Sequence, residues 1–118
     1  MQRILRATIH TLNGLRAVIE SEAAFRQEVV ALVLAIPLAF VVAAENWKRL
    51  VLIAVIILVL VVELLNTAIE KLADRVTSDH DPVIGRVKDM GSAAVGLSLL
   101  LAGLFWLLVI WECILALL

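Results

Sequence analysis

Cysteine is nearly absent from this chain, and so is any excess of charge of one sign. Cys113 is the only cysteine, so one chain holds no disulfide framework and no cysteine-based zinc site. The formal net charge is -1, which favours neither nucleic acid nor an acidic partner. The glycine-rich phosphate motifs G-x-x-x-x-G-K-[ST] and G-x-G-x-x-G are missing too, which excludes P-loop and protein-kinase sites. Any phosphate transfer must use another architecture.

Apolar residues are what the chain has in abundance. Hydrophobic residues make up 64% of its 118 residues and the mean hydropathy is +1.09, against about 45–50% apolar residues in a soluble domain. The length allows three spans of about 20 residues and no second domain beside them. Arg6, His10 and Arg16 interrupt the first apolar stretch, so we expect no cleavable signal peptide. The predicted fold class is all-α and integral to a membrane.

Charge and hydropathy divide this single membrane domain, residues 1–118, into segments. The first residues place apolar and polar side chains on opposite helical faces, as in a helix lying at the membrane surface. Ser, Asp, Pro and Gly cluster over Thr77–Gly85, which predicts a loop. Basic residues gather before the first span and between the second and third, which predicts a cytoplasmic position for both segments. The predicted segments are an amphipathic surface helix over 1–21, spans over 29–47, 50–70 and 91–112, and a helix end with a loop over 71–90.

The second span carries ionisable side chains along one helical face. Relative to Glu63, Asn66 falls at about −60°, Glu70 at about −20° and Asp74 at about +20°. A charge near the bilayer centre costs about 2.5–3.5 kcal/mol on insertion scales, so such residues are functional by default. Glu70 lies about 10 Å closer to the cytoplasm than Glu63, so the stripe could hold a lipid head and a water-soluble group together. Simple pairing with cations of neighbouring helices is the alternative.

Two further polar clusters lie at the ends of spans. Glu22 has the spacing of a helical ion pair with Arg26, but its carboxylate could also join Glu70 on a divalent cation. Mg²⁺ prefers one or two protein carboxylates, completed by water and phosphate oxygens. Arg86 and Lys88 precede the third span, where a helix N-terminus attracts phosphate. Anchoring at anionic headgroups is the other interpretation of these two cations.

Four stretches of the chain form a recognisable pattern, namely Glu22–Glu28, Val62–Glu70, Asp74–Arg75 and Gly85–Ala94. In order and spacing, over nearly the whole chain, they resemble the prokaryotic diacylglycerol kinase family. The resemblance implies a homotrimer with active sites shared between chains, in the bacterial inner membrane, and Mg-ATP as phosphoryl donor to the hydroxyl of diacylglycerol. The first stretch favours diacylglycerol over undecaprenol, the substrate of a related branch. His10 stands where the family has tyrosine, and residues 113–118 do not match its tail.

The same resemblance implies roles for individual residues. Glu63 is expected to be the catalytic carboxylate, and Glu22 and Glu70 the metal ligands. The residues expected at ATP are Arg3, His10, Glu22, Glu70, Asp79, His80, Asp81, Lys88 and Asp89. The residues expected at the lipid substrate are Arg3, Arg16, Glu28, Arg49, Glu63, Asn66, Ser92 and Trp106.

Two other functions compete with a lipid kinase. A small proton-coupled transporter would use Glu63 as its proton carrier but gives no reason for the polar residues gathered on the cytoplasmic side. A structural membrane subunit explains only the small residues of the third span, Ala94, Ser98 and Ala102. Because one chain leaves this small-residue face and the carboxylate stripe without partners, we expect an obligate oligomer.

Overall fold

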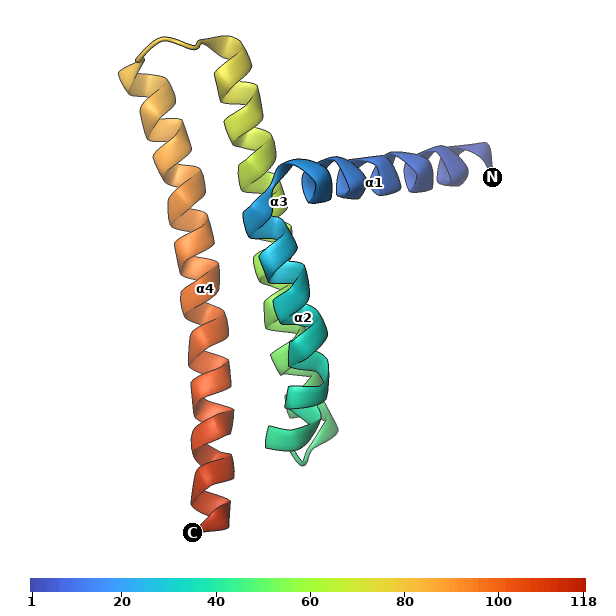
Figure 1. Cartoon of the computed structure of the whole chain (residues 1–118), viewed down its shortest axis with the longest axis vertical. Coiled ribbons are helices and arrows are strands. Elements are labelled where there is room, and N and C mark those ends of the chain that lie inside the picture. Colours follow the sequence, from blue (N-terminus) through green and yellow to red (C-terminus); the bar gives the residue numbers. More distant parts are fainter.

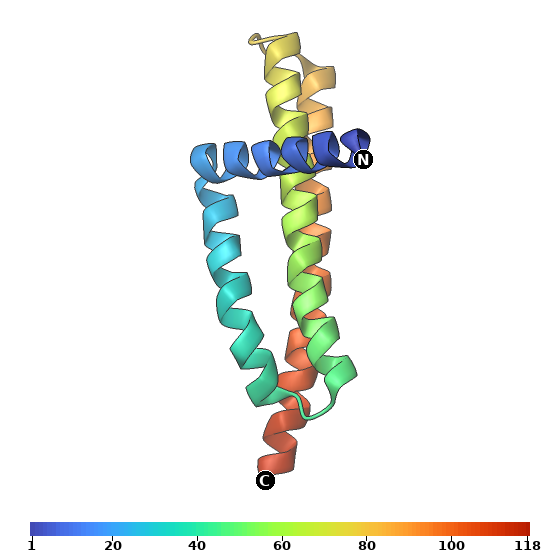
Figure 2. The ribbon, with the colours of Figure 1, turned by 90° about the vertical axis from the view of Figure 1, so that its right-hand side faces the viewer.

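The structure is a computed structural model that describes all 118 residues. The chain forms α1 (Gln2–Ser21), α2 (Ala23–Val42), α3 (Asn46–Val76) and α4 (Pro82–Leu117). The last three run along the long axis of the molecule, whereas α1 crosses them nearly at right angles (Figures 1 and 2). Each of the three is long and apolar enough to cross a membrane. The predicted all-α class with three candidate spans is confirmed.

The first span ends earlier than the predicted range 29–47, because Trp47 already lies in the first turn of α3. Ala43 and Glu45, which separate the two helices, both have extended backbone. The Nε atom of Arg49 donates to the carbonyl oxygen of Ala43 at 2.8 Å. This bond satisfies a carbonyl that has no partner inside α2, so the chain can leave the helix there.

The connection between α3 and α4 is shorter than the loop predicted over Thr77–Gly85. Only residues 77–81 lie between the two helices. The Asp81 carboxylate accepts hydrogen bonds from the backbone N–H groups two and three residues on, at 2.8 and 3.3 Å. Pro82 follows at the first helical position, where its missing N–H costs nothing. The residues that predicted a loop therefore begin a helix.

The four helices bury little of their surface against one another. Only 15 of the 118 residues are buried, because α3 packs against both α2 and α4 while those two barely touch. Most apolar side chains must therefore face lipid or another copy of the chain. Two small apolar clusters hold the long helices together in the half away from α1. They comprise Ala39, Ala43, Leu52 and Val109, and Val55, Val59 and Ala102.

The small residues of the third span do not form the free face that we expected. Ser98 and Ala102 are buried within the single chain, and Ala102 packs against Val55 and Val59 of α3. The Ser98 hydroxyl donates to the carbonyl oxygen of its own helix at Val95. That expectation is wrong for these two residues, because α3 already covers them.

Most of the apolar face of α1 has no partner within the chain. Ile4 and Leu12 are 69% and 61% exposed, while Val18, close to the start of α2, is 4% exposed. Figure 1 shows α1 projecting sideways from the bundle, on the same half of the molecule as the connection from α3 to α4. An apolar stripe directed away from its own bundle is typical of a helix that lies in a membrane interface.

Candidate active site

Three carboxylates lie in the region where α1, α2 and α3 meet. Glu63 projects from the middle of α3, and the negative charges of Glu70 and Glu22 both act on it. Glu22 is the single extended residue between α1 and α2. The continuous helix α3 keeps the predicted stripe in register, since no break separates Glu63 from Glu70. Glu63, Glu70 and Glu22 therefore lie near enough for their charges to interact, and their expected catalytic and metal-binding roles stay predictions.

Asn66 connects the stripe through a hydrogen bond. Its Nδ2 donates to Oε1 of Glu70 at 3.3 Å, while its Oδ1 is buried without a hydrogen-bond partner in the chain. None of the five ion pairs involves Glu70. The Glu70 carboxylate is thus oriented by an amide and carries no competing cation, which suits a ligand of a hard metal ion.

Lys71 contacts this site, although the sequence pattern did not single it out. Its Nζ donates to Ser21 Oγ at 2.9 Å and lies 3.7 Å from Oε1 of Glu22. The lysine thereby ties the junction of α1 and α2 to α3. A lysine beside a carboxylate in sequence is ordinarily a solvated side chain, so only the placement of the helices reveals this contact.

The oxygen donors fit Mg²⁺ as a small set. No three or more His, Cys, Asp or Glu side chains form a cluster that could hold a metal by themselves. Glu22 and Glu70 offer two carboxylates, and Mg²⁺ usually takes one or two from the protein and the rest from water and phosphate. The pair therefore matches the chemistry of a nucleotide-bound ion rather than that of a structural metal site.

Glu28 of α2 belongs to the same region. The charge of Glu63 acts on it, and its Oε2 is buried with no hydrogen-bond partner in the chain. A buried acceptor without a donor costs about 1–3 kcal/mol. This oxygen is therefore available to a hydroxyl group entering beside Glu63.

Four of the nine residues predicted at ATP gather at the far tip of α3 and α4. The connection between these helices and their facing ends line an open cavity of about 380 Å³. Lys88 of α4 donates to Asp74 of α3 across it. Asp79 and His80 line it too, as does Asp81, whose carboxylate also caps α4.

Two predicted residues of α4 do not line this cavity. Asp89 and Ser92 are exposed side chains of α4, and neither makes a side-chain hydrogen bond within the chain. Their expected contacts with nucleotide and lipid stay predictions.

The predicted residues of α1 stay apart from the carboxylates. Arg3 and His10 are exposed on the helix that projects from the bundle. Arg16 pairs with Glu20 of its own helix at 3.0 Å. Within one chain, α1 therefore brings none of its three predicted contacts to Glu63.

Arg49 and Trp106 also lie away from the site, toward the opposite end of the bundle. Arg49 is about 21 Å from Glu63 along the axis of α3, with its guanidinium 4.7 Å from the centre of the Phe40 ring. The Trp106 indole donates to the carbonyl oxygen of Leu52 at 3.1 Å. Their expected lipid contacts stay predictions, and any lipid that they touch lies at that end.

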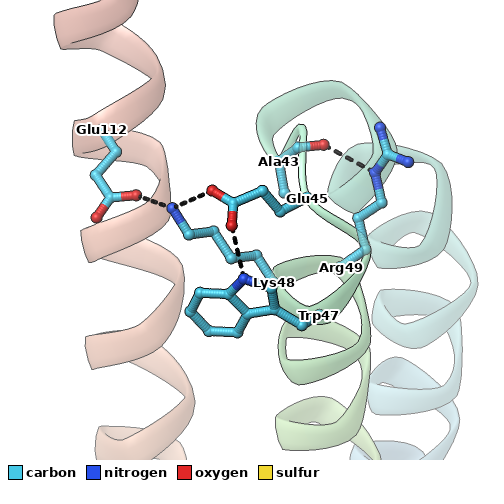
Figure 3. A network of polar contacts seen from close by, with 6 residues as sticks. All are labelled: Ala43, Glu45, Trp47, Lys48, Arg49 and Glu112. Carbon is cyan, nitrogen blue, oxygen red and sulfur yellow. Dashed lines mark hydrogen bonds and ion pairs between the residues drawn. The ribbon is translucent and has the colours of Figure 1, made fainter.

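A polar network closes this opposite end. Figure 3 shows the Lys48 ammonium between two carboxylates, 3.2 Å from Glu45 and 2.6 Å from Glu112 of α4. Glu45 also accepts from the Trp47 indole at 2.6 Å, and these hydrogen bonds, from Trp47 first and then Lys48, lower its pKa below 4.5. The network links the turn between α2 and α3 to α4.

A larger cavity, of about 490 Å³, lies beside this network rather than beside Glu63. Eight of its twelve lining residues are hydrophobic, as expected where helices open toward lipid. Its size does not make it the active site, because the carboxylates of the candidate site lie in the other half of the molecule.

The fold and the site together define a small helical membrane protein in which a carboxylate at membrane depth joins acidic and basic groups nearer the surface. A family profile described as prokaryotic diacylglycerol kinase matches residues 9–110. The chain belongs to this family, and the resemblance identified in its motifs is confirmed.

Individual relatives match over nearly the full length of the chain. It is 43% identical over 110 residues to the diacylglycerol kinase of Escherichia coli (strain K12), covering 93% of this chain and 90% of that protein. It is 44% identical over 106 residues to the diacylglycerol kinase of Pseudomonas aeruginosa, covering 90% and 86%. A diacylglycerol kinase of Helicobacter pylori is 34% identical over 105 residues, covering 89% and 82%.

Proposed function

We propose that this membrane protein, a lipid kinase by family, transfers the γ-phosphate of ATP to the hydroxyl of diacylglycerol and so forms phosphatidic acid. The observation that carries the proposal is the line of carboxylates running from Glu63 to the surface. One end of this line suits a lipid hydroxyl and the other end suits a phosphate-bound cation. A proton-coupled transporter would need Glu63 alone and would leave the arrangement of Glu22, Glu70 and Lys88 without a purpose.

In this proposal Glu63 is the general base. Its position about 10 Å below Glu70 along α3 suits a lipid hydroxyl, and the unpartnered Glu28 Oε2 in the same region can accept a hydrogen bond from that group. As the hydroxyl oxygen attacks the γ-phosphorus, Glu63 takes the hydroxyl proton and ADP leaves with the bridging oxygen. A positioned base contributes about 10²–10⁴-fold to such a step.

The polar residues above Glu63 hold the nucleotide. Glu22 and Glu70 would bind Mg²⁺, which neutralises charge on the phosphate oxygens when present. Asp74 holds the Lys88 ammonium at the edge of the 380 Å³ cavity, where it can exchange its carboxylate partner for a phosphate oxygen. Phosphoryl transfer depends mainly on such alignment and charge neutralisation.

The proposal includes a homotrimer with shared sites in the bacterial inner membrane. It is supported by the small buried core and by α1, whose N-terminal end projects away from the bundle in Figure 1. Arg3 and His10 belong to this helix. In an assembly these residues can reach the site of a neighbour. The basic residues on the side of α1 and of the connection from α3 to α4 favour a cytoplasmic position for that side.

Labelled γ-phosphate transfer in mixed micelles tests the activity, with diacylglycerol and undecaprenol offered separately. We expect transfer to diacylglycerol. Glu63→Gln should lower turnover about 10²–10⁴-fold while Mg-ATP binding survives, whereas Glu112→Gln, a carboxylate of the opposite end, should keep its turnover. Transfer only to undecaprenol would replace the substrate. Loss of ATP binding by Glu63→Gln, with normal transfer at saturating ATP, would rule out Glu63 as the base.

Shared sites are tested by mixing chains. A Glu63→Gln chain co-assembled with a Lys88→Met chain should recover part of the activity, because some sites then receive both intact residues. Each variant assembled alone provides the baseline. No recovery in verified mixed trimers would restrict each site to a single chain.

A further inference from the structure

Gly91 is the one glycine of the chain that faces another side chain at close range. A Cβ atom added to it would lie 2.1 Å from Oδ1 of Asn66 and 3.2 Å from its Cγ. Added at Gly96 or Gly103 of the same helix, it would meet nothing within 4 Å. No glycine of the chain has a positive φ, so Gly91 provides room for Asn66 and no special backbone conformation.

The Asn66 amide that occupies the space beside Gly91 is part of the candidate active site. Asn66 is 9% exposed, and its Nδ2 donates to Oε1 of Glu70 at 3.3 Å. The side chain thus lies between α4 on one side and a predicted metal ligand on the other. A methyl group at residue 91 would push first on Oδ1, and Asn66 can yield only by turning its amide away from its present place.

We propose that Gly91 is a positioning residue for the metal site. By leaving space on α4 for the Asn66 amide, it keeps that amide on Glu70 and so fixes the orientation of the Glu70 carboxylate. The inference rests on the proposed function, in which Glu70 binds the Mg²⁺ of Mg-ATP. Gly91 itself touches neither substrate nor metal and acts entirely through Asn66.

The expected effect follows from how supporting hydrogen bonds tune metal ligands. Loss of a hydrogen-bond partner of a ligating residue typically lowers metal affinity about 10–100-fold. Gly91→Ala should therefore raise the Mg²⁺ concentration needed for half-maximal activity by about this factor. Turnover at saturating Mg²⁺ should change far less, since Glu63 and Lys88 are untouched. The matched controls Gly96→Ala and Gly103→Ala, with open space around the new methyl group, should keep the original Mg²⁺ requirement.

A double-variant series shows whether the effect passes through Asn66. Asn66→Ala alone should raise the Mg²⁺ requirement, because Glu70 loses its amide. Adding Gly91→Ala to Asn66→Ala should have no further effect, since the amide that the new methyl group would meet is gone. If Gly91→Ala raises the requirement by the same factor in both backgrounds, the proposal is overturned. A fall in turnover at an unchanged Mg²⁺ requirement would overturn it as well.

Two measurements avoid dependence on activity. Binding of Mn²⁺ in the presence of a non-hydrolysable ATP analogue, followed by electron paramagnetic resonance, should weaken in Gly91→Ala and stay unchanged in Gly96→Ala.

Folding in micelles, followed by helix content, covers the case in which Gly91→Ala does not fold. If adding Asn66→Ala to Gly91→Ala restores folding, the contact between residue 91 and Asn66 is supported. If Gly91→Ala fails to fold both alone and together with Asn66→Ala, the proposal is overturned. Failure of the proposed function would look different, because wild type would transfer no phosphate or Glu70→Gln would leave the Mg²⁺ requirement unchanged.

Discussion

Replacing Lys71 by glutamine should lower the Mg²⁺ concentration that the enzyme needs. The Lys71 ammonium lies 3.7 Å from Glu22, so it competes with the metal for one of the two proposed ligands. The two side chains are 55% and 36% exposed, and solvent screening limits such a pair to about 0.2–1 kcal/mol. Because about 1.4 kcal/mol corresponds to a tenfold change in affinity, Lys71→Gln should lower the Mg²⁺ requirement by about 1.4- to 5-fold.

The assay is phosphate transfer at saturating ATP and lipid over a titration of free Mg²⁺. Lys71→Arg keeps the charge and should leave the requirement nearly unchanged. Ser21→Ala removes the 2.9 Å hydrogen bond to Lys71 but retains the ammonium, so it separates the tethering role from the charge. The gain from Lys71→Gln should shrink at high ionic strength, because salt already screens this exposed pair.

A higher Mg²⁺ requirement in Lys71→Gln would refute the reasoning. It would mean that Lys71 holds Glu22 in place for the metal rather than competing with the metal. The competition argument would also fail if Ser21→Ala reproduced the whole effect of Lys71→Gln, since the charge of Lys71 would then be irrelevant.

Three further predictions follow from the site and the core. Glu22→Gln and Glu70→Gln should each raise the Mg²⁺ requirement. The double variant should be little worse than either single one, because ligands of one ion act as a unit. Losses of activity that multiply at saturating metal would argue against a shared ion. Leu52→Ala removes a fully buried side chain and should lower the free energy of unfolding in micelles by about 2–5 kcal/mol. Leu104→Ala, at an exposed position, should lower it much less in the same detergent titration. The pKa of Glu45 is lowered, so its stabilising contact with Lys48 should be fully present above its ordinary pKa of 4.5. The contact should disappear as the pH falls through the lowered pKa. An NMR titration of the Glu45 side chain with a midpoint at or above 4.5 would contradict this.

Hydropathy and helical periodicity predicted the parts of this fold that depend on one helix at a time. The spans follow from the apolar runs, and the contact between Asn66 and Glu70 follows from their spacing of one helical turn. The start of α4 was missed because Asp and Pro are common both in loops and at the first positions of a helix. Local composition cannot separate these two cases when a long apolar helix follows directly.

Contacts between helices were beyond the reach of sequence patterns. Lys71 meets Ser21, and Gly91 makes room for Asn66, only because α3 crosses its neighbours at particular rotations. Those rotations depend on packing all along the helices. The positions predicted from family resemblance divide in the same way, because Glu63, Asn66 and Glu70 share one stripe of α3 while the predicted residues of α1 lie apart from it.

The placement of the two apolar clusters has a practical consequence for engineering the protein. They bind the long helices in the half that holds Leu52 and Val109, while the carboxylates proposed for the reaction occupy the other half. Substitutions that fill space around Leu52 can therefore make the scaffold more durable without approaching Glu63. Stabilising substitutions often lower turnover where the side chains that stabilise the fold and those that react share one location. We expect this trade-off to be weak in this molecule, because the two sets lie apart.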